Sequence, residues 1–182
     1  VRGLAEACRA FEVPVVSGNV SLYNDTQGRS IHPTPTVAMV GLIETLGALP
    51  SSSFERPGDR LLLLGKDFAE FGGSTYLRLL FDVEQGMPPH VDLEAEVRLA
   101  RVLRDLVRSG LVSMVHDLAR GGLGAALARC SFGRGIGCEV RWEQGPARLF
   151  SESQARALVA VAPAEADRVG HRLEAAGVPF ED

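Results

Sequence analysis

Residues 92–110, DLEAEVRLARVLRDLVRSG, form the most regular stretch of this sequence. Apolar side chains recur every three or four residues, at positions 93, 97, 100, 103, 107 and 111, which is the period of one helix face. Asp92 can accept hydrogen bonds from the first free backbone N–H groups of a helix, and Gly110 can adopt the left-handed conformation that often ends one. The stretch therefore predicts an amphipathic helix over 92–110.

Short apolar runs and further helical patterns surround this helix. The expected strands are 61–64, 111–115 and 157–161, the expected helices are 123–130 and 163–176, and residues 178–182 read as the beginning of another strand. Helix 163–176 has Pro163 in its first turn and Gly177 just after its end, which are typical positions for both residues. Strands alternating with helices predict a mixed α/β or α+β fold.

The first fifty residues follow a different pattern. Residues 1–12 read as a helix, Val13–Val16 as a short buried strand that leads into a polar loop, and Thr36–Ile43 as an apolar strand. Residues 47–58 carry two prolines and three consecutive serines, a composition typical of a linker or domain boundary. Because Val1 is not Met and already lies inside a helical pattern, we expect the chain to be a piece of a longer protein.

Composition narrows the classes of function. The 182 residues carry a formal charge of −4, which gives no basic field for a nucleic acid. No apolar run approaches the length of a membrane span, and the first residues lack the apolar centre of a signal peptide. The three cysteines, Cys8, Cys130 and Cys138, lack tight spacing and are expected to be buried free thiols in a reducing cytoplasm.

The loop SGNVSLYN, residues 17–24, has the side chains of a nucleotide and metal site. A glycine lets phosphate approach the backbone, an asparagine carbonyl can ligate a hard cation, and a serine offers a hydroxyl. An ordinary polar loop after a strand is the alternative interpretation.

Three other stretches concentrate polar groups, and each also has a structural interpretation. HDLARGGL at 116–123 places two glycines at a helix start, where backbone N–H groups attract anions or where the helix only needs tight packing. FSESQAR at 150–156 can bind a polar ligand or form a solvated turn. EFGGS at 70–74 favours a tight helix entry capped by Ser74, because the Lys and the spacing of a P-loop are missing.

Taken together and in this order, these stretches resemble one family. The run PVVSGNVSLYN at 14–24, followed by IHPTP at 31–35 and VGLIE at 40–44, is similar to the large ATP-using subunit of phosphoribosylformylglycinamidine synthase, PurL. The stretches FGGS at 71–74, HD…GGL at 116–123 and FSESQ at 150–154 fit the C-terminal portion of that subunit. The HD…GGL pattern is shared with a wider superfamily of aminoimidazole ribonucleotide synthetase, selenophosphate synthetase and thiamine-monophosphate kinase.

The resemblance implies a fold and an activity. Residues 1–50 would be the tail of an ATP-binding A-type module of PurM-like fold, and 57–182 a B-type α/β module. The subunit would convert formylglycinamide ribonucleotide to its amidine in purine biosynthesis, using ATP, Mg²⁺ and ammonia from a glutaminase partner, with a small bridging subunit in the same cytoplasmic complex. No nucleic acid or membrane partner is expected, and the isolated piece is expected to be inactive.

The resemblance also implies residue roles. It assigns Gly18 to ATP, Asn19 to Mg²⁺ and Ser21 to substrate, and the catalytic histidine of the family to a part outside this sequence. The resemblance implies that the full subunit contains two tandem copies of the A-type and B-type modules and that this chain belongs to the second copy. Glu152, Ser153 and Gln154 match a substrate-binding triplet of the first B-type module, and in the second copy they can serve an auxiliary nucleotide site instead. A non-catalytic nucleotide-binding scaffold and another ATP-using enzyme of the superfamily remain the alternatives.

Overall fold

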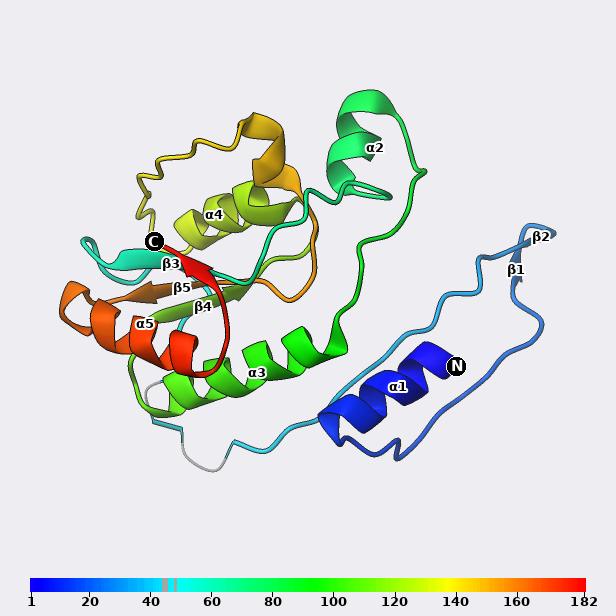
Figure 1. Cartoon of the computed structure of the whole chain (residues 1–182). Helices are drawn as coiled ribbons and strands as arrows, with labels where there is room; N and C mark the ends of the chain where they lie inside the picture. The colour runs from blue at the N-terminus through cyan, green and yellow to red at the C-terminus, as the bar shows by residue number, and fades with distance from the viewer. Residues whose placement is uncertain (44–45, 48) are drawn as a thin grey trace. The chain divides into compact units, whose positions relative to one another are not determined.

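The computed structural model describes residues 1–43, 46–47 and 49–182, and these residues divide into two compact units, Val1–Gly47 and Ala48–Asp182 (Figure 1). Position 44 of the VGLIE run and position 48 of the expected linker lie outside the described residues. The module limits inferred from the resemblance, 1–50 and 57–182, stay predictions. Within the described part, every helix is too short or too polar to span a bilayer.

The first unit contains one helix and one small hairpin. Helix α1, Arg2–Phe11, is followed by the cap residue Glu12, whose φ of 56° is left-handed. Strands β1, Asp25–Thr26, and β2, Arg29–Ser30, pair antiparallel. The two residues between them both have positive φ, 54° at Gln27 and 73° at Gly28, as a tight hairpin turn requires.

Two strands expected in this unit do not form. Residues 13–16 and 36–43 have no strand structure, and Val15 and Val16 are 76% and 91% exposed. An apolar run becomes a buried strand only if a neighbouring strand satisfies its backbone and a second layer covers its face. Among the described residues of this unit, the sheet consists of the two-residue strands β1 and β2, which cannot supply either.

The second unit is built on a four-stranded sheet with the order β4-β5-β3-β6, in which every neighbouring pair is antiparallel. Its strands are β3 (Arg60–Leu64), β4 (Met114–Asp117), β5 (Ala157–Val161) and β6 (Phe180–Glu181). Its helices are α2 (Thr75–Phe81), α3 (Leu93–Arg108), α4 (Gly122–Phe132) and α5 (Ala166–Ala175), with short 3-10 turns η1 (Pro146–Phe150) and η2 (Pro163–Glu165). The expectation of a mixed α+β fold is therefore confirmed.

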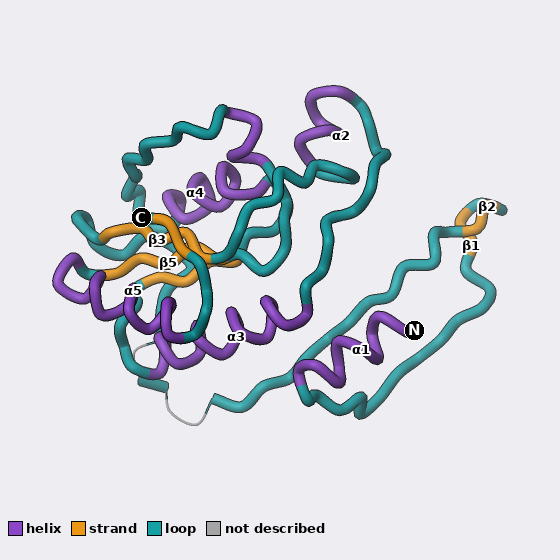
Figure 2. The backbone as a smooth tube through the Cα atoms, viewed as in Figure 1, coloured by secondary structure: helices purple, strands orange, loops and turns teal. Residues whose placement is uncertain are grey.

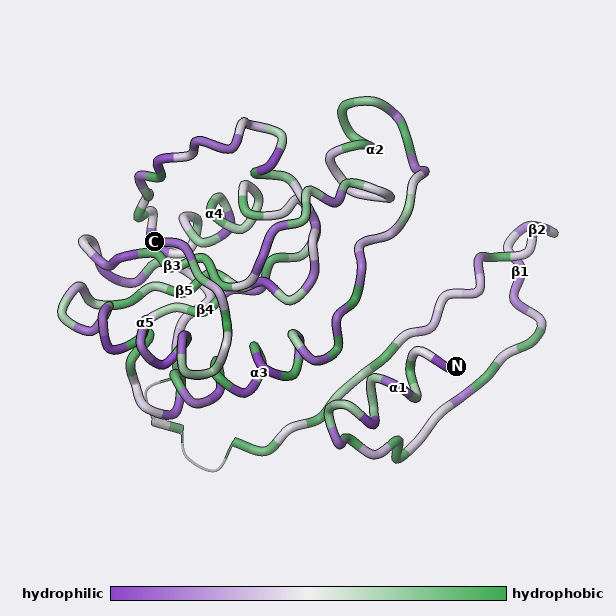
Figure 3. Tube along the Cα trace, viewed as in Figure 1, coloured by the Kyte–Doolittle hydropathy of each residue, from purple (hydrophilic) through white to green (hydrophobic). Residues whose placement is uncertain are grey.

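Helices cover both faces of this sheet (Figure 2). Strand β5 runs through the middle with all five residues buried, and its side chains alternate between the two faces. Val159 and Val161 belong to the core shared with α3 and α5, whereas Leu158 and Ala160 belong to the core shared with α4. The strands β3 and β5 are accordingly among the hydrophobic parts of the trace in Figure 3.

Helix α3 confirms the expected ends but corrects the expected buried face. The Asp92 carboxylate accepts hydrogen bonds from Glu94 N and Ala95 N, both at 3.0 Å, and Gly110 follows the helix with a φ of 65°. The fully buried residues are Leu99, Val102 and Leu106, whereas position 100 of the predicted stripe is exposed. The predicted apolar positions lie beside the buried face of the helix. Leucines and valines occur on more than one face of α3, and the sheet covers only one of these faces.

The remaining elements agree with the sequence in type and shift at their ends. The strand expected at 157–161 is confirmed, and the one expected at 111–115 begins at Met114, because residues 111–113 form the connection from α3. The helix expected at 163–176 is divided into η2 and α5. Ser74 caps α2 as expected, since its hydroxyl accepts from Leu77 N at 3.2 Å.

Candidate functional site

Three of the polar stretches meet around the loop formed by residues 151–154. The backbone N–H of Glu152 donates to the carbonyl of Glu70 at 3.0 Å. The carboxylate oxygen Oε1 of Glu152 accepts from Thr75 N at 2.9 Å and from Gly121 N at 2.7 Å. One side chain therefore joins the start of α2, the entry of α4 and the loop 151–154.

The second glycine of the GGL pattern allows this contact. Gly122 has a φ of 57°, and a Cβ atom placed on it would lie 2.3 Å from the carbonyl oxygen of Ser151 and 2.9 Å from that of Leu149. Any larger residue would have to push the backbone of the loop 151–154 away from α4. The close-packing interpretation of this glycine is therefore supported by the structure.

The two serines of the loop are buried and hold a second segment of backbone. Ser151 and Ser153 are both 0% exposed. The Ser151 hydroxyl accepts from Glu70 N at 3.0 Å, and the Ser153 hydroxyl accepts from Phe68 N at 3.1 Å. The loop 151–154 thus fixes residues 68–70 as well as the two helix starts.

A buried charge cluster lies beneath this loop. Asp67 accepts a hydrogen bond from Arg148 Nε at 2.6 Å, and its other carboxylate oxygen is 3.8 Å from Arg156 Nη1. Burial alone would raise the pKa of Asp67, but the hydroxyl of Ser151, the N–H of Ala69 and the two guanidinium groups outweigh burial and hold that pKa below its usual range.

Arg156 is the most deeply buried charged residue of this cluster. Its side chain is 0% exposed, and its Nε and Nη2 atoms have no hydrogen-bond partner among the described residues. Burial lowers the pKa of Arg156, and the nearby Asp67 acts in the opposite direction. Asp67 is the carboxylate that compensates this guanidinium most strongly, and Glu181 adds to its effect.

The pattern of polar residues in the sequence indicated the loop and Arg156 but not Asp67 or Arg148. Asp67 lies three residues after the buried strand β3. A polar residue soon after a buried strand is the sequence feature that could have indicated it as a candidate site residue. That signal was weak because Asp67 and its partner Arg148 are 81 positions apart in the sequence.

Gln154 differs from its neighbours because its side chain is exposed. Its amide Nε2 donates to the carbonyl of Glu152 at 3.1 Å. It lines a cavity of about 210 Å³ in the second unit, together with Gly65, Lys66, Phe68, His90, Asp92, Ala95, Arg98, Leu99, Ala155, Gly177, Val178 and Pro179. Lys66 and Arg98 bring basic groups to this cavity. They are opposed by the Asp92 carboxylate that caps α3 and by the Glu94 carboxylate, which lies 3.5 Å from Arg98 Nη1.

The HD pair of the HD…GGL pattern lies at the end of β4. His116 Nδ1 is 2.6 Å from the carbonyl oxygen of Asp117, and the Asp117 side chain is 83% exposed. The two side chains make no hydrogen bond to the loop 151–154 in the described part of the chain. This pair therefore takes no part in the hydrogen bonds that join Gly121 to the loop 151–154.

The loop 17–24 belongs to the first unit, and all its residues are exposed. Asn24 Nδ2 donates to the carbonyl of Ser21 at 2.6 Å, which closes the loop on itself. A Cβ atom placed on Gly18 would meet nothing within 4 Å, so the backbone there is open to approach. The amide oxygen of Asn19 and the hydroxyl of Ser21 are therefore accessible to ligands. Among the described residues, no group of three or more His, Cys, Asp or Glu side chains could hold a metal ion by itself.

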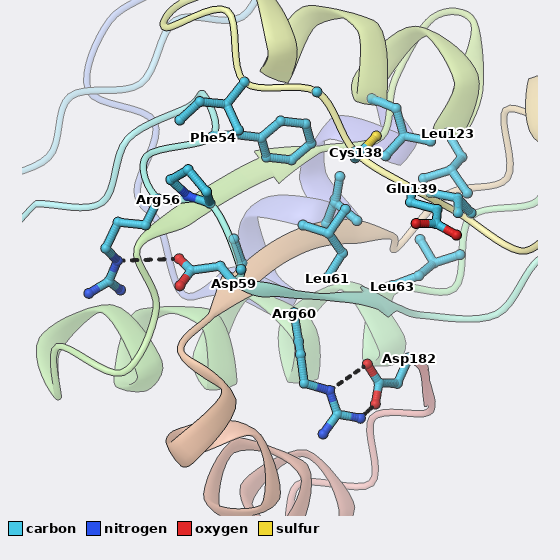
Figure 4. Close-up of a pocket in the computed structure, with 18 of the residues that line it drawn as sticks. Phe54, Arg56, Asp59, Arg60, Leu61, Leu63, Leu123, Cys138, Glu139 and Asp182 are labelled. Atoms are coloured by element: carbon cyan, nitrogen blue, oxygen red, sulfur yellow. Dashed lines mark hydrogen bonds and ion pairs between the residues drawn. The ribbon is translucent and has the colours of Figure 1, made fainter.

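A larger cavity of about 880 Å³ lies over β3 and was not expected from the sequence (Figure 4). Leu61 and Leu63 of β3 and Leu123 of α4 are part of its apolar lining, and an ion pair between Arg60 and Asp182 lies at its edge. Segment 136–142 forms another wall. The polar groups of the loop 151–154 do not reach this cavity.

Comparison with known proteins places this arrangement in a family. Residues 56–182 match the family model described as AIR synthase related protein, C-terminal domain, and residues 1–43 match the model of the N-terminal domain. The chain belongs to the AIR synthase related protein family. The resemblance inferred from the motifs is confirmed, since curated relatives in this family are named PurL.

The relatives in the AIR synthase related family are much longer than this chain. The PurL subunit of Alkaliphilus metalliredigens is 45% identical over 184 residues, which cover 100% of this chain and 25% of the relative. The PurL subunit of Bradyrhizobium sp. (strain BTAi1) is 45% identical over 98% of this chain and 25% of its own length. A structure of T. maritima PurL complexed with FGAR matches 74% of this chain and 25% of the other, with a TM-score of 0.58 and 22% identity, and it supports the fold. The chain spans about a quarter of the length of these curated relatives.

Proposed function

We propose that this chain is part of the ATP-using subunit of phosphoribosylformylglycinamidine synthase, a cytoplasmic ligase of purine biosynthesis. The reaction joins nitrogen from ammonia or glutamine to formylglycinamide ribonucleotide at the expense of ATP. The observation that carries the proposal is the 45% identity to a curated PurL subunit along the whole chain. Because the relatives are about four times as long, the chain would supply one part of a composite site, and a glutaminase and a small bridging subunit would be its partners.

The loop 17–24 is the part of the chain that we assign to the nucleotide. Gly18 would let a phosphate approach the backbone, Asn19 would offer its amide oxygen to Mg²⁺, and Ser21 would donate a hydrogen bond to the substrate. The accessibility of all three residues supports this assignment. A single amide ligand fits Mg²⁺, which commonly binds through one or two protein oxygens and completes its shell with phosphate oxygens and water. When bound, the ion would neutralise charge that develops on the transferred phosphoryl group.

The substitution Asn19→Ala in the full-length protein tests this assignment. We expect amidine formation with ammonia as nitrogen donor to fall on the order of 100-fold, because the ion that would neutralise the reacting phosphate loses its protein ligand. The melting temperature should be unchanged, since Asn19 is exposed. Gln27→Ala, which removes an exposed amide from the nearby hairpin, is the matched control and should retain activity. Turnover of Asn19→Ala near that of the wild type would contradict the metal assignment.

A second candidate is a scaffold that binds a nucleotide without catalysis in this half of the protein. It is favoured by the loop 151–154, where Glu152 and Ser153 use their oxygen atoms to hold backbone N–H groups. The two candidates predict different results for Asn19→Ala, because a scaffold would retain turnover when this amide is removed.

A further inference from the structure

The three side chains of the triplet Glu152-Ser153-Gln154 differ in how many hydrogen bonds they already make within the protein. Glu152 has one carboxylate oxygen that already accepts two backbone hydrogen bonds, at 2.9 Å from Thr75 and 2.7 Å from Gly121. Both donors lie where helices begin, and N–H groups there lack partners within the helix. The Glu152 side chain therefore caps the starts of both helices.

The hydroxyl of Ser153 is likewise occupied by contacts within the protein. Its side chain is 0% exposed, and its hydroxyl accepts from Phe68 N at 3.1 Å and lies 3.4 Å from Asp67 Oδ1 and 3.3 Å from the hydroxyl of Ser151. A ligand could reach this hydroxyl only by displacing the surrounding backbone. Ser153 therefore holds the segment after β3 in place.

The side chain of Gln154, in contrast, makes few contacts within the protein. It is exposed, and its amide nitrogen makes one hydrogen bond, to the carbonyl of Glu152, which turns the side chain back along the loop. It borders the 210 Å³ cavity that also receives Lys66 and Arg98. Ala155, the next residue, is fixed by the Glu96 carboxylate, which accepts from Ala155 N at 2.9 Å, so the backbone that carries Gln154 is anchored on both sides.

We propose that Glu152 and Ser153 are positioning residues in this module, and that Gln154 is the side chain of the triplet that contacts a bound ligand. The amide of Gln154 can donate and accept hydrogen bonds. Lys66 and Arg98 can bind the phosphate of a ligand in this cavity, in competition with Glu94, whose carboxylate lies 3.5 Å from Arg98, and with Asp92. This inference rests on the proposed function for the identity of the ligand, which is either the ribonucleotide substrate or the adenine nucleotide. The division of roles within the triplet rests on the contacts alone.

The test uses the full-length protein with the variants Gln154→Ala, Glu152→Gln and Glu152→Ala. Michaelis constants for the ribonucleotide and for ATP, kcat and the exchange rates of the Thr75 and Gly121 amide hydrogens are measured for each. Gln154→Ala should raise one of the two Michaelis constants about 10-fold, as expected for the loss of a hydrogen bond to a charged group, with kcat and amide exchange unchanged. The constant that rises identifies which ligand occupies the cavity.

The two Glu152 variants separate positioning from ligand contact. Glu152→Gln keeps an oxygen that can accept from both N–H groups, so it should retain protected amides and both Michaelis constants within about 3-fold. Glu152→Ala should accelerate exchange at Thr75 and Gly121 by about 10-fold or more and lower the melting temperature, because two N–H groups lose their partner.

Two results would overturn the inference. One is a rise in a Michaelis constant in Glu152→Gln that equals the effect of Gln154→Ala, with amide exchange unchanged. The other is a Gln154→Ala variant whose two Michaelis constants equal those of the wild type. If Glu152→Ala fails to fold, Glu152→Gln and Gln154→Ala still decide the question. If the wild-type protein makes no amidine, the proposed function is wrong, but amide exchange in the Glu152 variants still tests the positioning role.

Discussion

At Asp67, a carboxylate with a side chain only 8% exposed meets the guanidinium groups of Arg148 and Arg156. The pKa of Asp67 is held below its usual range in the folded chain. A carboxylate with a lowered folded pKa contributes stability above its unfolded pKa of about 4, and this contribution is lost as pH falls through the folded pKa. Protonation of Asp67 at low pH is therefore expected to lower the stability of the folded chain.

The substitution Asp67→Asn should lower the free energy of unfolding of the chain by about 3 kcal/mol at pH 7, because it removes the principal counter-charge of buried Arg156. The difference from the wild type should begin to narrow as the pH falls below about 4, where the carboxylate of the unfolded chain is protonated, and should be smallest once the pH lies below the lowered folded pKa. Urea unfolding at pH 7 and at successively lower pH measures both effects. Glu94→Gln removes a carboxylate that is 88% exposed and should change stability by less than about 0.5 kcal/mol at any pH. An equal loss in both variants, or a difference independent of pH, would show that Asp67 is not coupled to Arg156.

The same residue shows why the sequence predicted only part of the candidate site. The loop 151–154 was identified because its polar residues are adjacent in sequence, and proximity in sequence is directly visible. Asp67 and Arg148 were missed because their contact exists only after β3 and η1 have been brought together. The role of Glu152 as a cap for two helix starts was hidden for the same reason, since its partners are 77 and 31 positions away.

Among the elements, helix α3 has ends that the sequence predicts and a buried face that depends on packing against distant elements. Its ends were predicted because a cap residue and a terminal glycine act locally. Its buried face was not predicted correctly, because residues 99, 102, 103, 106 and 107 are all leucine or valine and several faces appear apolar. The choice among these faces is made by the position of the sheet and of α5, which lie far away in sequence.

A pair of matched substitutions checks the corrected face of α3. Leu106→Ala should lower the free energy of unfolding by about 3–5 kcal/mol, because Leu106 is 0% exposed and its removal leaves a cavity against the sheet. Leu103→Ala removes the same atoms from a partly buried position at the edge of the same core and should cost about 1–2 kcal/mol. Chemical denaturation of both variants measures the two values. If Leu103→Ala proved the more damaging substitution, the face predicted from periodicity would be the correct one.

Over the whole molecule, the alternation of strands and helices was visible in the sequence, but the order of the strands was not. The ALVAV run at 157–161 was expected to be a buried strand, and it occupies the middle of the sheet with cores on both faces. Its neighbours β3 and β4 follow from antiparallel pairing of segments about 100 and 40 residues away, which no local pattern specifies. Conversely, the apolar runs at 13–16 and 36–43 had the composition of strands but found no partners within the described part of their unit.

This contrast between the two units predicts different rates of amide hydrogen exchange in the 182-residue chain. Amides in β5 should exchange slowly, because they pair with β3 and β4 and lie between two hydrophobic cores. Amides of residues 13–24 and 32–43 should exchange at rates within about 10-fold of an unfolded chain, because these segments are exposed and outside regular structure. Exchange followed by mass spectrometry of peptic fragments measures both regions in one sample, and the exposed helix α1 provides an intermediate reference. Protection of residues 36–43 comparable to that of β5 would mean that this apolar run pairs as a strand in solution, as its sequence predicts.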